Sequence, residues 1–167
     1  MKSVTQNELD SLYNTMQSVR KEDGSYDWHD FTTPKNRKII SRLSREELLD
    51  FKSAMRKVDL GMTHSFVREA YAMNPNEDEK FLWDGMSDED MNVPLFIVQN
   101  NNCPAKLLEA VAENDQDSLG GEVMLDYIRE KHPEILVEAR RHREALKSGD
   151  FYSPTYIEPL YSLPHVG

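Results

Sequence analysis

Residues 67–86 read VREAYAMNPNEDEKFLWDGM, and residues 93–112 read VPLFIVQNNNCPAKLLEAVA. The two stretches align without a gap at an offset of 26 residues (93 − 67). The identical pairs are Val67/Val93, Asn74/Asn100, Asn76/Asn102, Lys80/Lys106 and Leu82/Leu108. A fixed period of about 20–50 residues is typical of stacked helical repeats. We therefore expect residues 67–115 to contain one helical unit twice.

Each copy is predicted to fold as a short helix, an asparagine-rich turn and a second helix. In the second copy the turn covers residues 100–104, Asn-Asn-Asn-Cys-Pro. Asparagine tolerates left-handed backbone angles, so an asparagine of this turn is expected to end the first helix. Asn102 is expected to cap the second helix through its side-chain oxygen, with Pro104 in the first turn of that helix. In the first copy, residues 74–76 are predicted to form the same corner.

A third, degenerate copy is also expected, because two short helices cannot bury their apolar faces without a stacked neighbour. The stretch from Pro133, PEILVEA, resembles the stretch from Pro104, PAKLLEA, at an offset of 29 residues (133 − 104). The helix before it is predicted over residues 122–131, and the last helix from Pro133 to about Lys147.

The two copies resemble the leucine-rich repeat variant family, whose short alternating helices form a superhelix akin to HEAT-type arrays. The resemblance is carried by residues 72–82 and 98–115, with the shared spacing Asn-x-Asn-x-x-x-Lys-x-Leu. It implies binding rather than chemistry. Some members carry an iron–sulfur cluster on several cysteines, but this chain has only Cys103, so no cofactor is carried over. The alternative is an ordinary helical bundle in which the likeness between the copies is chance.

The predicted fold class is all-α, with short helical hairpins stacked as an irregular, solenoid-like repeat domain and an extended C-terminal tail. A chain of 167 residues is long enough for one domain with a sizeable core. We place that domain at residues 1–149, with N-terminal helices over 1–62 and degenerate repeats over 63–149. The tail, residues 150–167, combines three prolines with several aromatics, which disfavours helix and favours an extended path along a groove of this protein or of a partner.

The chain carries a formal net charge of −10 and has a pI near 5.0. This charge argues against a generic binder of nucleic acid or anionic membranes, because phosphate contacts need a basic surface. It allows a basic protein partner, or mimicry of nucleic acid. One cysteine, no signal peptide and no apolar run of about 18 residues together predict a cytoplasmic, intracellular protein that does not span a membrane.

The N-terminal region contains two capping-box patterns, Thr5–Glu8 and Ser44–Glu47, each of which predicts the start of a helix. A short helix is expected over residues 36–43. Gly61 is expected to stop the helix that begins at Ser44, and Thr63 is expected to cap the helix that enters the first copy.

The loop over residues 25–34 holds Tyr26, Trp28, His29 and Phe31. Aromatic side chains in a loop usually plug the edge of a core, and the alternative is a hot spot for a partner. The following basic residues are interpreted as a solvated face rather than a phosphate site: Lys35, Arg37, Lys38, Arg42 and Arg45.

The acidic cluster Ser87-Asp88-Glu89-Asp90 is predicted to lie at a helix start, where carboxylates are stabilised by exposed N–H groups. It lacks the ligand spacing of a calcium loop. The chain also lacks the common metalloprotease, phosphate-loop and serine-hydrolase motifs, and its five histidines show no ligand spacing. No catalytic, metal-binding or cofactor-binding residue is assigned, and Cys103 is expected to be a small buried residue.

The sequence thus predicts a non-enzymatic protein-binding module. Its predicted contact residues are Trp83, Asp88, Glu89, Asp90, Asn101, Tyr152, Tyr156 and Tyr161. One alternative is an accessory or structural subunit of a larger assembly, a virus being one candidate source, anchored by the tail. Another is an acidic inhibitor that mimics nucleic acid. An enzyme built around Cys103 is the remaining alternative.

Overall fold

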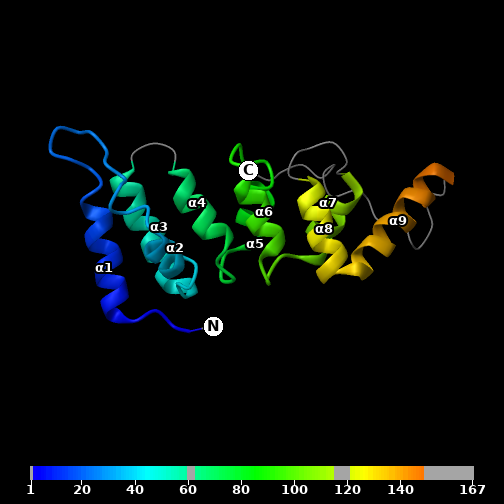
Figure 1. The fold of residues 1–167 in the computed structure, drawn as a ribbon, viewed down its shortest axis with the longest axis horizontal. Helices are drawn as coiled ribbons and strands as arrows, with labels where there is room; N and C mark the ends of the chain where they lie inside the picture. Colours follow the sequence, from blue (N-terminus) through cyan, green and yellow to red (C-terminus); the bar gives the residue numbers. More distant parts are fainter. Residues whose placement is uncertain (1, 60–62, 115–120, 149–167) are drawn as a thin grey trace. The chain divides into compact units, whose positions relative to one another are not determined.

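The computed structural model describes residues 2–59, 63–114 and 121–148. Within these ranges the chain forms nine helices and no strand, which confirms the predicted all-α class (Figure 1). The chain divides into two compact units, Met1–Asp78 (unit 1) and Glu79–Gly167 (unit 2). The single domain over residues 1–149 stays a prediction, and the tail over residues 150–167 lies outside the described residues.

The described part of unit 1 contains four helices. They are α1 (Gln6–Gln17), α2 (Pro34–Ile40), α3 (Arg45–Val58) and α4 (Ser65–Ala72). Helix α2 packs against α1 and α4, and α1 also packs against α3. The helices enclose an aromatic core in which Phe51 contacts Phe31 and Tyr71, at 6.4 and 6.2 Å between ring centroids. Phe31 is fully buried, so this member of the aromatic loop plugs the core edge as expected.

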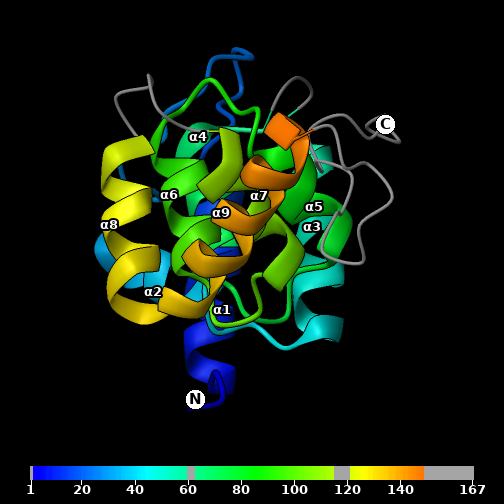
Figure 2. The ribbon, with the colours of Figure 1, turned by 90° about the vertical axis from the view of Figure 1, so that its right-hand side faces the viewer.

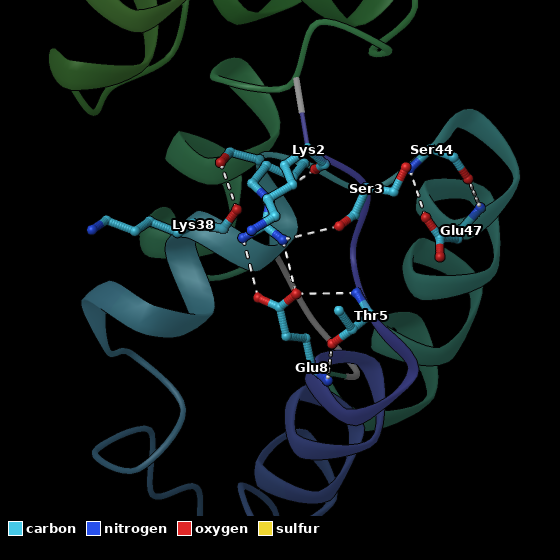
Figure 3. A network of polar contacts seen from close by, with 9 residues as sticks. Lys2, Ser3, Thr5, Glu8, Lys38, Ser44 and Glu47 are labelled. Atoms are coloured by element: carbon cyan, nitrogen blue, oxygen red, sulfur yellow. Dashed lines mark hydrogen bonds and ion pairs between the residues drawn. The ribbon is translucent and has the colours of Figure 1, made fainter.

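Both predicted capping boxes are present. The Thr5 hydroxyl accepts a hydrogen bond from the Glu8 N–H, the Glu8 carboxylate accepts one from the Thr5 N–H, and Ser44 and Glu47 do the same for α3. Figure 3 shows the capping bonds between Thr5 and Glu8. Arg42 also donates to both oxygens of the Glu8 carboxylate, at 2.9 and 3.1 Å. These hydrogen bonds hold the pKa of Glu8 at about 2, with Arg42 as the largest cause. A cap predicted from local sequence is thereby tied to the end of α2.

Two helix boundaries differ from the predictions. Helix α2 begins at Pro34 rather than at residue 36, because the Thr33 side chain caps it and proline fits the first helical position. Helix α4 is capped by His64 rather than by Thr63, through a ring nitrogen that accepts the Phe66 N–H at 3.0 Å. The predicted stop at Gly61 lies outside the described residues.

The asparagines of the first copy act through their side chains. No described residue other than glycine has a positive φ, so the expected left-handed asparagine turn is wrong. Asn74 is fully buried and donates to the carbonyls of Ile40 and Leu43, and Asn76 also donates to Leu43. Carbonyls at a helix C-terminus lack intrahelical partners, and the asparagine amides supply them. The turn is therefore anchored to the end of α2 by side-chain hydrogen bonds.

The described part of unit 2 contains five helices. They are α5 (Glu79–Gly85), α6 (Asn92–Gln99), α7 (Ala105–Asn114), α8 (Gly121–Lys131) and α9 (Pro133–Ser148). Helix α8 packs against α6, α7 and α9, and α7 packs against α9. In Figure 2, α8 is the yellow helix and α9 is the orange one. Their shared core includes Ile97, Leu107, Ile128 and Ala139, all almost fully buried.

The turns of the two copies have the same hydrogen bonds at an offset of 26 residues. Asn74 and Asn100 accept the N–H groups of Asn76 and Asn102 at 2.8 and 2.9 Å. The backbone bonds also match, because residues 77 and 103 donate to the carbonyls of residues 74 and 100. The predicted third copy instead joins α8 to α9 through His132 alone, without an asparagine turn. The asparagine turn therefore occurs twice with the same hydrogen bonds, and a repeated helical unit and its stacking in an array stay predictions.

Candidate protein-binding surface

Helices α5 and α6 pack closely because Gly85 has no side chain. Gly85 is buried at the end of α5, and a Cβ built there would lie 2.5 Å from Cδ1 of Ile97. That distance is shorter than any normal contact between carbon atoms. The absence of a side chain at Gly85, the last residue of α5, therefore sets how closely the end of α5 approaches α6.

The acidic loop between α5 and α6 is ordered by its own carboxylates. Asp90 accepts the N–H of Asn92, the first residue of α6, at 3.0 Å, and Asp88 accepts the N–H of Asp90 at 2.8 Å. The predicted location of this cluster at a helix start is therefore confirmed. Glu89 is exposed, and within the described residues it makes neither of these bonds.

Two apolar side chains accompany the carboxylates. Trp83 lies on α5, is half-buried, and donates its indole N–H to Glu79 at 3.3 Å. Met91, between the loop and α6, is 52% exposed. We call Trp83, Asp88, Glu89, Asp90 and Met91 the acidic–aromatic surface. It combines negative charge with the kind of large apolar side chain that dominates interface energetics.

The other predicted contact residues do not join this surface. Asn101 is exposed in the turn after α6, and the acidic loop precedes α6. A helix of eight residues is about 12 Å long, so Asn101 and the acidic loop lie at opposite ends of it. Tyr152, Tyr156 and Tyr161 lie outside the described residues.

The basic residues of unit 1 are partly neutralised by carboxylates. Arg37 pairs with Glu69 at 3.0 Å and lies over the Phe66 ring, and Arg42 pairs with Glu8. Lys35, Lys38 and Arg45 are exposed. Two of the five cations, Arg37 and Arg42, are therefore paired with carboxylates of the same unit. This pairing favours the interpretation of these basic residues as a solvated face rather than a phosphate site.

Sequence reasoning missed two buried pairs of ionisable side chains, one in each unit. In unit 1, Lys52 pairs with Glu77 beside a hollow of about 10 Å³, the room that one water needs. Burial raises the pKa of Glu77, and the hydrogen bond from Lys52 opposes that rise. In unit 2, His142 pairs with Glu113, and both side chains are almost completely buried. Nothing in the local sequence distinguishes His142 from an exposed histidine.

Three further observations concern the reactivity of Cys103, metal binding and membrane-spanning helices. Burial raises the pKa of the Cys103 thiol to about 12, which keeps it protonated and weakens it as a nucleophile. Among the described residues, no group of three or more histidine, cysteine or acidic side chains could hold a metal ion. No helix in the described ranges is long and apolar enough to cross a bilayer.

Comparisons with protein-family models, with curated proteins and with solved structures found no match to this chain. The structure alone describes this chain, as an all-α protein in which the same asparagine turn occurs twice and in which carboxylates of the acidic loop bond to its backbone.

Proposed function

We propose that this chain is a non-enzymatic protein-binding module, and that its acidic–aromatic surface holds a partner with a basic surface. The observation that carries the proposal is the placement of Trp83 on α5 and of the exposed Met91 just before α6, on either side in sequence of a loop with three carboxylates. Aromatic anchors supply most of the binding energy of an interface. Complementary charge adds specificity and a faster association rate.

The rigidity of the loop supports the same function. Its backbone is fixed by Asp88 and Asp90, and its approach to α6 is fixed by the close contact at Gly85. A surface that is ordered before binding loses little conformational entropy when a partner arrives. The net charge of −10 also attracts a basic partner electrostatically before contact.

The test uses the tagged full-length chain to capture proteins from lysates of its source cells. Trp83→Ala removes the anchor, and we expect about a 30-fold loss of affinity, the usual effect of a hot spot worth about 2 kcal/mol. Glu89→Lys reverses a charge without removing a loop hydrogen bond, so it should also reduce capture, and raised salt should weaken capture by the unchanged chain.

The matched control is Glu130→Lys, an equal charge reversal at an exposed position near the end of α8. Circular dichroism should show that all variants keep their helix content. A partner lost by Trp83→Ala and Glu89→Lys but kept by Glu130→Lys would support the proposal. Retention of every captured protein by the first two variants would contradict it.

A further inference from the structure

The segment after α1 forms a short hairpin over residues 20–30, drawn in blue in Figure 1 and projecting beyond α1. Arg20 and Tyr26 form an isolated β-bridge, and the Lys21 N–H donates to the Ser25 carbonyl at 2.8 Å. Gly24 has a φ of +85°, a backbone conformation that side chains disfavour, so it closes the turn. The hairpin is thus an ordered element, although it belongs to no helix.

The base of the hairpin is fixed by aromatic packing. The Trp28 ring lies 4.6 Å from the His64 ring and 6.1 Å from the buried Phe31 ring. The Tyr26 ring lies nearly parallel to Trp28, at 6.2 Å between centroids and 10° between planes. Tyr26 is 41% exposed, so the outer ring of this pair is accessible while the inner one is held by the core.

The charges of the hairpin residues are mainly negative. The hairpin holds four exposed carboxylates against two cations, the carboxylates being Glu22, Asp23, Asp27 and Asp30 and the cations Arg20 and Lys21. An aromatic ring attracts a cation through its negative face. A guanidinium group fits better than an ammonium, because its plane stacks on a ring and its N–H groups can pair with a carboxylate through two bonds.

We propose that this hairpin, residues 20–30, is a second docking surface and that its occupant is an arginine side chain in a basic segment of a partner protein. The proposal rests on the proposed function only in requiring a basic partner. It concerns residues of unit 1, whereas the acidic–aromatic surface belongs to unit 2. The two surfaces are therefore separable by experiment.

The experiment titrates the isotopically labelled full-length chain with a hexa-arginine peptide and follows the two indole N–H resonances. Trp28 reports on the hairpin and Trp83 on the acidic–aromatic surface, and Trp28→Phe and Trp83→Phe assign the signals. We expect the Trp28 resonance to shift on binding. Tyr26→Ala should weaken the affinity read at Trp28 about fivefold, whereas Tyr26→Phe, which keeps the ring, should not change it.

A second variant controls for the case in which Tyr26→Ala disorders the hairpin. Glu22→Lys reverses an exposed charge and leaves the ring packing intact, so it should also weaken binding at Trp28, while Glu130→Lys in unit 2 should not. A hexalysine peptide should bind at Trp28 at least about threefold more weakly than hexa-arginine, since it cannot stack.

The outcomes separate the two surfaces. An unchanged Trp28 resonance, or equal affinity of the original chain, Tyr26→Ala and Glu22→Lys, overturns the hairpin proposal. If only Trp83 shifts, and Glu89→Lys abolishes that shift, the hairpin proposal fails while the acidic–aromatic surface stands. If only Trp28 shifts, with the expected effect of Tyr26→Ala, the hairpin is the docking surface and the contact assigned to Trp83 fails.

Discussion

His64 links the stability of one helix to pH. Its Nδ1 accepts the Phe66 N–H at 3.0 Å, which is possible only while that nitrogen carries no proton. Burial lowers the pKa of His64 below its ordinary value of 6.5, with an opposing effect from Asp59 and a smaller lowering by Arg68. Because the folded-state pKa is the lower one, the contribution of the cap is complete above pH 6.5. It is lost as the pH falls from there toward the folded-state pKa.

We therefore expect His64→Asn to reduce the pH dependence of stability. Asparagine caps a helix through its amide oxygen and does not titrate. Between about pH 7.5 and pH 5 the original chain should lose up to about 1 kcal/mol more unfolding free energy than His64→Asn, the usual contribution of an N-cap.

Urea unfolding followed by circular dichroism at several pH values measures this difference. If the unfolding free energies of His64→Asn and of the original chain change equally with pH, the cap does not titrate in this range.

Gly85 is the residue on which the α5–α6 contact depends. Gly85→Ala places a methyl group against Cδ1 of Ile97, a fully buried side chain. Overpacking costs about 1–3 kcal/mol, and the better helix propensity of alanine offsets about 1 kcal/mol of that. We expect Gly85→Ala to lower the unfolding free energy by about 1 kcal/mol.

A double-mutant cycle identifies the cause. Ile97→Val removes Cδ1, the atom that the new methyl group would meet, and alone it should cost about 1 kcal/mol. The double variant should therefore be more stable than the sum of the single effects predicts, by about 1 kcal/mol. Strict additivity in urea unfolding would mean that α5 moves away from α6 and that the contact does not limit the packing.

At the scale of the whole molecule, each unit contains one tryptophan, Trp28 in unit 1 and Trp83 in unit 2. The single domain predicted from the sequence requires one cooperative transition. In Trp28→Phe the remaining fluorescence reports on unit 2, and in Trp83→Phe it reports on unit 1. We expect the fluorescence midpoint in urea to equal the circular-dichroism midpoint within each variant.

This comparison needs no correction for the stability change of either substitution, because both signals come from one protein. Coincident midpoints in both variants would establish one cooperative domain. A fluorescence midpoint that differs from the circular-dichroism midpoint would instead show that Met1–Asp78 and Glu79–Gly167 unfold separately.

The features that the sequence predicted correctly are local. Thr5 and Ser44 start helices because the capping partner lies three residues away, and Asp90 meets the start of α6 two residues away. The turns of the two copies match because their asparagines bond to groups two residues along the chain. That Trp83 and the acidic loop belong to one contact surface stays a prediction, made because they are neighbours in sequence.

The sequence by itself therefore determined the helical class, the starts of α1 and α3 and the place of the repeated turn, since each depends on residues within about one helical turn. The tertiary structure decided which polar groups are buried and with what. Lys52 meets Glu77 across 25 residues, His142 meets Glu113 across 29, and Asn74 reaches the carbonyl of Ile40 across 34. Such pairs form only where packed helices bring distant residues together, because a polar side chain is costly to bury without a hydrogen-bond partner.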